Sequence, residues 1–214
     1  MSKRLFKTNR DESVRLFRNN FLEYFSHIHP ATPAVVYIPV TAIISYFGLS
    51  RITPGNFILM FLLGILFWSL LEYIIHRFVF HYQPKTDLGK RIHFLSHGVH
   101  HDYPRDRTRL VMPLLVSLPL AIIFYFVFLI LFGPNYYLPA FAGLLIGYVA
   151  YDSIHYATHH WKMTGPVGRY LKDYHLKHHY VNPDSAYGVS NPFWDYVFFT
   201  VPVNEKGKVP MNRD

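Results

Sequence analysis

The sequence predicts an all-α membrane protein with four transmembrane helices arranged as two helical hairpins. Three observations lead to this fold class. Apolar residues make up 51% of the 214-residue chain and charged residues only 16%, which is below the quarter that soluble globular proteins carry. Four long apolar stretches each approach the ~20 residues that cross a hydrocarbon core. Short links containing glycine or proline join these stretches in pairs, as tight turns between neighbouring helices require.

The predicted elements follow in chain order. A polar N-terminal segment, residues 1–33, is followed by transmembrane helices expected at 34–49, 56–80, 110–132 and 136–157. The first helix is short for a span, and the fourth contains Asp152 and His155. Two histidine-rich polar segments, 81–109 and 158–200, complete a single membrane domain at 34–200, and residues 201–214 form a C-terminal tail.

Lysine and arginine are distributed unevenly along the chain. Residues 1–33 hold six of the 21, while 77–109 and 158–214 hold seven each; the links at 50–55 and 133–135 hold one and none. Because positively charged loops stay in the cytoplasm, both termini and the central polar segment are predicted to be cytoplasmic. Topology and anionic lipid headgroups explain the net charge of +8, and no nucleic-acid partner is expected.

Histidine is the residue type that points to a function. The chain has 14 histidines and no cysteine, so any metal site must use imidazole, carboxylate or water rather than thiolate. Twelve histidines form four clusters near the predicted cytoplasmic side: His76 and His81; His93, His97, His100 and His101; His155, His159 and His160; and His175, His178 and His179. The topology was inferred from lysine and arginine alone, so the clustering agrees with it independently.

The spacing within these clusters favours metal binding. Residues three and four apart share a helix face, so each of three sets can project into one place: His97, His100 and His101; His155 and His159; and His175, His178 and His179. His76 and His81 are five residues apart, which fits either a helix end or two ligands serving different metals. Two metals would use roughly eight to ten imidazoles, and that number is present.

Four histidines receive other interpretations. His27 and His29 lie apart from the clusters and are interpreted as polar residues near the membrane surface. His93 and His160 are expected to orient a metal ligand through hydrogen bonds. Imidazole-rich sites suit zinc, copper, iron and nickel. A structural zinc needs only about four ligands, so the surplus indicates redox chemistry on a membrane-soluble substrate.

The motifs "HRFVFH", "HFLSHGVHHDYP", "YDSIHYATHH" and "HLKHHY" resemble those of the integral-membrane fatty acid hydroxylase and sterol desaturase superfamily. The flanking sequences "RLVMP" and "GVSNPFWDYVFFT" are similar to those of fatty acid 2-hydroxylases. The resemblance implies two iron ions in a four-helix membrane domain capped by a cytoplasmic helical domain. It also implies ten metal ligands, all present here: His76, His81, His97, His100, His101, His155, His159, His175, His178 and His179.

This resemblance implies O2-dependent hydroxylation of the alpha carbon, C2, of long-chain fatty acyl groups, either free or in a sphingolipid. Related enzymes often carry an N-terminal haem domain that delivers electrons. We expect no such domain here, so a separate protein, a b-type cytochrome or a ferredoxin with its reductase, is the expected donor. Zinc is expected to replace iron in some purified samples. The expected location is a bacterial inner membrane or the endoplasmic reticulum.

Two alternative functions stay open at this stage. One keeps the metal pair but makes the chain a sterol or carotenoid hydroxylase or desaturase. The other is a metal-binding membrane transporter, a class whose sites usually lie near the bilayer midplane, whereas these histidines gather at one face.

Six further residues are candidates for the site. Tyr151 and Asp152 are expected either to shape the cavity and support a ligand or to pack at a helix end. Phe193, Trp194 and Tyr196 are predicted to contact the apolar tail of a substrate. Arg109, in "PRDRTRL", is predicted to hold a carboxylate or phosphate, with ordinary cytoplasmic positive charge as the alternative.

Overall fold

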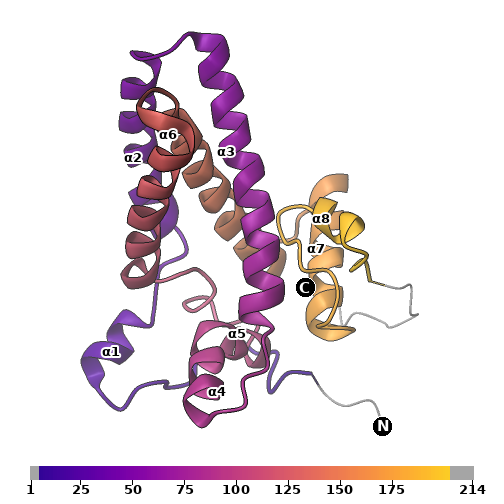
Figure 1. Ribbon diagram of the computed structural model, residues 1–214. Coiled ribbons are helices and arrows are strands. Elements are labelled where there is room, and N and C mark those ends of the chain that lie inside the picture. Colours follow the sequence, from indigo (N-terminus) through magenta and orange to yellow (C-terminus); the bar gives the residue numbers. More distant parts are fainter. Residues whose placement is uncertain (1–4, 203–214) are drawn as a thin grey trace.

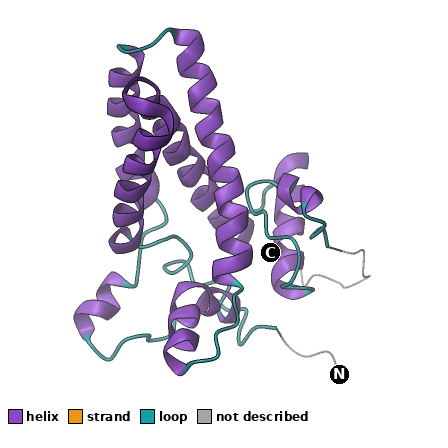
Figure 2. Ribbon diagram, viewed as in Figure 1, coloured by secondary structure: helices purple, strands orange, loops and turns teal. Residues whose placement is uncertain are grey.

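The computed structural model describes residues 5–202, and every regular element in that range is a helix (Figures 1 and 2). The predicted all-α class is therefore confirmed. The predicted tail, 201–214, lies outside the described residues from residue 203 onward. The elements are α1 (Asn20–Phe25), α2 (Thr32–Leu49), α3 (Pro54–Ile74), the π-helix η1 (Ile75–Phe80), α4 (Asp87–His93), the π-helix η2 (Phe94–Gly98), α5 (Val99–Asp102), α6 (Leu114–His160), α7 (Pro166–Tyr180) and α8 (Phe193–Val197).

Three helices are long and apolar enough to cross a membrane: α2, α3 together with η1, and α6. In Figure 1 they run alongside one another as a bundle, with α4 and α5 at its lower end and α7 and α8 beside the lower half of α3. The stretches predicted at 34–49 and 56–80 correspond to α2 and to α3 with η1. The predicted stretch 136–157 and all of 110–132 from residue 114 onward lie in α6.

The long helix α6 consists of two arms that fold back on each other. Its 47 residues are interrupted at Gly133, whose φ of 70° is non-helical, and Pro134 follows. The Tyr125 and Tyr137 hydroxyls lie 2.9 Å apart, whereas residues twelve apart in a straight helix are separated by about 18 Å. The first arm begins at Leu114 and not at 110 as predicted, because Pro113 keeps the residue before it out of the helical conformation.

The second arm of α6 packs closely against α3. A Cβ on Gly64 of α3 would collide with the Ala140 backbone, and one on Gly143 of α6 would collide with the Phe61 backbone. Small residues allow such close approach between membrane helices. This contact fixes the lower end of α3 relative to the lower end of α6. Histidines lie at the lower end of each of the two helices.

Candidate metal centre

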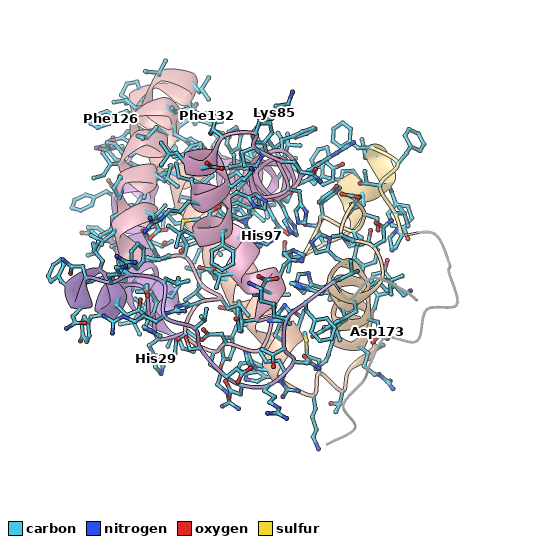
Figure 3. The ribbon with its side chains drawn as sticks, turned by 90° about the horizontal axis from the view of Figure 1, so that it is seen from below. His29, Lys85, His97, Phe126, Phe132 and Asp173 are labelled. Carbon is cyan, nitrogen blue, oxygen red and sulfur yellow. The ribbon has the colours of Figure 1, made fainter. Side chains whose placement is uncertain are left out.

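The ten histidines implied as ligands lie at the lower end of the bundle, where several segments meet. The π-helix η1 supplies His76, and His81 follows it directly. The next three come from η2 and α5, two from the end of α6 and three from α7. Eight of the ten are buried and two are partly buried. Figure 3, seen from below, places His97 in the middle of the molecule and His29 near its edge.

The first histidine group consists of His76, His81, His97, His101 and His178. Each offers one ring nitrogen, and these nitrogens all lie within 4.8 Å of one another. The Nε2 atoms of His76 and His101 lie 3.2 and 3.0 Å from Nε2 of His97, and that of His178 lies 3.2 Å from Nε2 of His101. Two nitrogens bound at about 2.0–2.1 Å to one ion lie about 3 Å apart, so the spacing fits a shared metal.

The second histidine group consists of His100, His155, His159, His175 and His179, with the same 4.8 Å limit between its nitrogens. Nε2 of His155 lies 3.0 Å from that of His100. The Nε2 atoms of His159 and His179 lie 2.9 and 3.1 Å from Nε2 of His175. All five side chains are buried, so within the described chain the second group is enclosed by protein.

The two groups are direct neighbours. The His101 ring of the first group stacks on the His179 ring of the second, with centroids 4.3 Å apart and an interplanar angle of 23°. His97 and His100, one from each group, have ring centroids 5.6 Å apart. Ten nitrogen donors in two adjacent sets of five fit a pair of metal ions and supply no thiolate or carboxylate ligand.

The π-helix η1 explains the five-residue spacing of His76 and His81. A π-helix forms hydrogen bonds from residue i to i+5, and here the His81 amide donates to the His76 carbonyl at 3.2 Å. Residues five apart then lie one above the other, and both rings enter the first group. The idea that these two residues serve different metals is therefore wrong, because it assumed α-helical geometry.

Two of the predicted same-place sets are divided between the groups. His97 and His101 belong to the first group and His100 to the second. In α7, His175 and His179 belong to the second group and His178 to the first. The expectation of one destination per cluster was wrong for these sets, because each helix lies between two neighbouring sites and presents a different side to each.

Burial keeps these imidazoles neutral. It lowers the pKa of His81 to about 4 and that of His100 to about 3, from an ordinary value of 6.5. Burial also takes the pKa of His175 and of His178 well below the usual range, and neighbouring histidines act in the same direction. Neutral imidazole is the form that binds metal, so the side chains are in the binding form at neutral pH.

The remaining histidines lie outside both groups. Burial lowers the pKa of His81, and electrostatic repulsion from the nearby His93 lowers it further. The His160 ring stacks on Tyr156 with centroids 4.5 Å apart, and no described residue hydrogen-bonds its Nε2. His27 contacts the Thr108 hydroxyl through Nδ1 at 2.7 Å. An orienting role for His93 and His160 stays a prediction.

A largely apolar cavity of about 400 Å³ lies beside both groups. Its lining includes His97, His100 and His155, together with Tyr151 and Asp152, the two residues singled out in the fourth apolar stretch. The polar N-terminal segment also lines this cavity, with Leu16, Phe17, Leu22 and Phe25. Sequence reasoning missed these four residues, although apolar side chains recurring in a basic segment were a usable signal.

The other predicted substrate contacts lie elsewhere. Phe193, Trp194 and Tyr196 on α8 do not line this cavity; Trp194 docks on α3, its Nε1 donating to the Ser69 hydroxyl at 3.0 Å. Arg109 does line it, but its Nη2 donates to Glu23 at 2.6 Å. Arg109 thereby ties the N-terminal segment over the cavity, and its predicted contact with a substrate carboxylate stays a prediction.

Comparison with known proteins agrees with the motifs. Residues 61–200 match the sequence profile of the family described as fatty acid hydroxylase. The dihydroceramide fatty acyl 2-hydroxylase of Arabidopsis thaliana is 34% identical over 91% of this chain and 82% of its own length. The ceramide very long chain fatty acid hydroxylase of Saccharomyces cerevisiae is 40% identical over 88% of this chain, which spans about half of that relative, 49%.

A solved structure agrees as well. Full-length Scs7p, in which only the hydroxylase domain is visible, superposes with a TM-score of 0.81 at 39% identity, over 86% of this chain and 70% of that one. The resemblance inferred from the histidine motifs is confirmed. The chain belongs to the fatty acid hydroxylase family.

Proposed function

We propose that this protein hydroxylates C2 of long-chain fatty acyl groups, free or in a sphingolipid, in a reaction that uses O2. The observation that carries the proposal is the position of a largely apolar cavity against two adjacent groups of five imidazoles. The relatives named above are hydroxylases of ceramide acyl chains. A volume of about 400 Å³ falls in the range of about 300–1,000 Å³ typical of small-molecule sites.

The two histidine groups would each hold one metal ion, and iron is the metal we propose. The fit rests on ten neutral, converging nitrogens with burial that excludes competing water. Iron bound there would supply the redox chemistry that breaks an unactivated C–H bond, which no side chain can do. Zinc binds similar imidazole sets and can replace iron during purification. We propose that a separate b-type cytochrome or ferredoxin with reductase delivers the electrons.

The protein's own residues would bind and orient the acyl chain. Apolar side chains from both the N-terminal segment and the start of α6 line the cavity, so they hold the tail and exclude water. Asp152 also lines it, and no described residue hydrogen-bonds its Oδ2. We propose that Asp152 and Tyr151 contact the polar end of the acyl group, which would place C2 near His97, His100 and His155.

The membrane arrangement is part of the same proposal. We propose that residues 34–200 form one domain with four spans in two hairpins, the bend at Gly133 joining the second pair. The lysine and arginine distribution supports cytoplasmic termini and a cytoplasmic metal centre within a helical cap. The bundle would then present the cavity to acyl chains at the cytoplasmic face of the bilayer.

A lipid profile of an expressing host tests this function. We expect 2-hydroxy acyl lipids with the wild type and with His29→Ala, whose histidine lies outside both groups. His178→Ala, which removes a first-group nitrogen, should abolish the product. Unchanged acyl lipids with wild-type protein, iron and an electron donor supplied would contradict the proposal. A modified sterol or carotenoid in the same profile would instead identify the alternative substrate class.

A further inference from the structure

The two histidine groups differ in the hydrogen bonds made by the ring nitrogens that face away from the group. In the first group, Nδ1 of His76 donates to the Tyr187 carbonyl at 2.5 Å, and Nδ1 of His178 donates to the Ser185 carbonyl at 2.7 Å. A proton fixed on Nδ1 leaves the Nε2 lone pair free for a metal. In the second group, the buried Nδ1 atoms of His155, His175 and His179 have no hydrogen-bond partner among the described residues, and in the first group the same holds only for Nε2 of His81.

Both accepting carbonyls belong to the loop between α7 and α8, residues 181–192. A buried carboxylate on α3 holds this loop from one side. Glu72 accepts the Val189 and Ser190 amides at 2.7 and 2.8 Å, and it also accepts the Ser190 hydroxyl. Glu72 lies four residues before His76 in the sequence, so adjacent turns of α3 and η1 carry the ligand and a group that holds the loop two residues beyond the ligand's partner, Tyr187.

A second buried carboxylate holds the loop from the other side. Asp195 on α8 accepts the Tyr187 and Gly188 amides at 2.9 and 2.8 Å and the Thr200 hydroxyl at 2.7 Å. A Cβ on Gly188 would collide with the Asn191 carbonyl and lie 2.9 Å from Asp195 Oδ2. Amide groups that donate to a carboxylate form strong, short hydrogen bonds, so the loop is held directly at Tyr187, where it meets His76. Next to Ser185, where it meets His178, it is held indirectly, because the Ala186 amide donates at 2.8 Å to the carbonyl of Thr200, whose hydroxyl donates to Asp195.

We propose that Glu72 and Asp195 are positioning residues that act through this loop to fix the tautomer and orientation of His76 and His178. The two metal positions are therefore unequal. The first group is preorganised and binds its ion more tightly, while the second group exchanges its ion more readily. Neither carboxylate belongs to a histidine group, so both act at a distance. The inference rests on the proposed function only in requiring that each group binds a metal.

Zinc titration of single-site proteins tests this inference without any need for activity. Because four imidazoles still suffice for zinc, each group is disabled by three changes: His159→Ala, His175→Ala and His179→Ala leave the second group two histidines, and His97→Ala, His101→Ala and His178→Ala do the same to the first. The Kd of the remaining site for Zn²⁺ is measured by competition with a chromophoric chelator in detergent-purified protein. We expect the first group to bind more tightly, and Glu72→Gln or Asp195→Asn to weaken it by about 10–100-fold, as loss of such supporting bonds does elsewhere.

The same carboxylate changes in the protein whose first group is disabled should leave the second group's Kd unchanged. Ser190→Ala removes only one of the hydrogen bonds to Glu72, so it should weaken Zn²⁺ binding by the first group less. It serves as the test variant if the carboxylate variants fold poorly. Asp106→Asn is the matched control, because Asp106 is equally buried but bonds Ser13 and Thr108. Equal weakening of both groups, or none of the first, would overturn the inference. Failure of the wild type to bind Zn²⁺ would instead contradict the proposed metal centre.

Discussion

Histidines of the same chemical type have different surroundings in this protein. Burial lowers the pKa of His81, His100, His175 and His178. In contrast, His27 lies near the surface beside Glu23, and their side chains are 35% and 15% exposed. A buried neutral imidazole costs little while the pH is high, because it needs no charge. In acid the same side chain lowers the free energy of unfolding, because the unfolded chain binds protons that the buried imidazole does not bind.

The metal-free protein is therefore expected to lose stability in mild acid. With the pKa of His81 at about 4 and that of His100 at about 3 in the folded protein, against 6.5 when unfolded, only the unfolded state gains protons between these limits. The free energy of unfolding should fall as the pH drops below about 6.5 and keep falling toward pH 4. Thermal unfolding of chelated protein in detergent, from pH 7.5 to 4.5, measures this; an unchanged Tm across that range would contradict it.

At the scale of elements, the contact between α3 and α6 decides where the histidines at their lower ends lie. Gly64 and Gly143 bring the two backbones together at the middle of the bundle, and His76 and His155 follow further along the same helices. A wider separation there would move the first group relative to the second. Helix packing far from the site is thus a condition for two adjacent groups.

Gly143→Ala is expected to destabilise the protein, because the added methyl would meet the Phe61 backbone, which cannot move as a side chain can. Overpacking of this kind costs about 1–3 kcal/mol. Gly55→Ala is the matched control, since a Cβ there meets nothing within 4 Å. Tm in detergent compares the two variants with the wild type. A Tm for Gly143→Ala equal to that of Gly55→Ala would show that α3 and α6 are further apart than described.

Local sequence rules predicted part of this arrangement. Among the ten histidines of the two groups, those four apart share a group: His97 with His101, His155 with His159, and His175 with His179. Four residues advance an α-helix by about 40°, whereas one residue advances it by about 100°, so His100 and His178 face the neighbouring group. Which group each joins depends on how the helices pack, and spacing along one helix carries no information about that.

Two other features also lay beyond local rules. The pairing of His76 with His81 needed a π-helix, which is rare enough that α-helical geometry is the default assumption. The cavity lining depended on where the N-terminal segment docks. That position is set by the hydrogen bond from Arg109 to Glu23, two residues that are 86 positions apart in the sequence. Trp194 of α8 was predicted to contact the substrate tail, but its indole donates to Ser69 on α3 instead.

For the whole molecule, the histidine groups connect α7 to several other segments. The α7 helix bears three of the ten nitrogens, and its remaining partners in each group come from the bundle and from η2 and α5. A metal in each group would therefore cross-link α7 to the bundle. Binding energy for a metal becomes folding energy for whatever the metal holds together.

Removal of metal should loosen α7 selectively. We expect amide hydrogen exchange in residues 166–180 to rise by about tenfold or more after chelation, because the opening free energy loses the metal contribution. The α3 helix, 54–74, packs against α6 through its apolar face and should keep its protection. Mass-spectrometric exchange on loaded and chelated protein compares these segments. Equal protection of α7 in both samples would show that protein contacts alone hold it.

The spread of the ligands along the chain also orders the events of biosynthesis. The first group joins His76 to His178, and the second joins His100 to His179, so both close only when nearly the whole described chain has left the ribosome. The bundle helices, in contrast, are complete by residue 160. Completion of both groups therefore comes after the bundle helices have been synthesised. A nascent chain halted before residue 175 would already lie in the membrane and still be unable to complete either group.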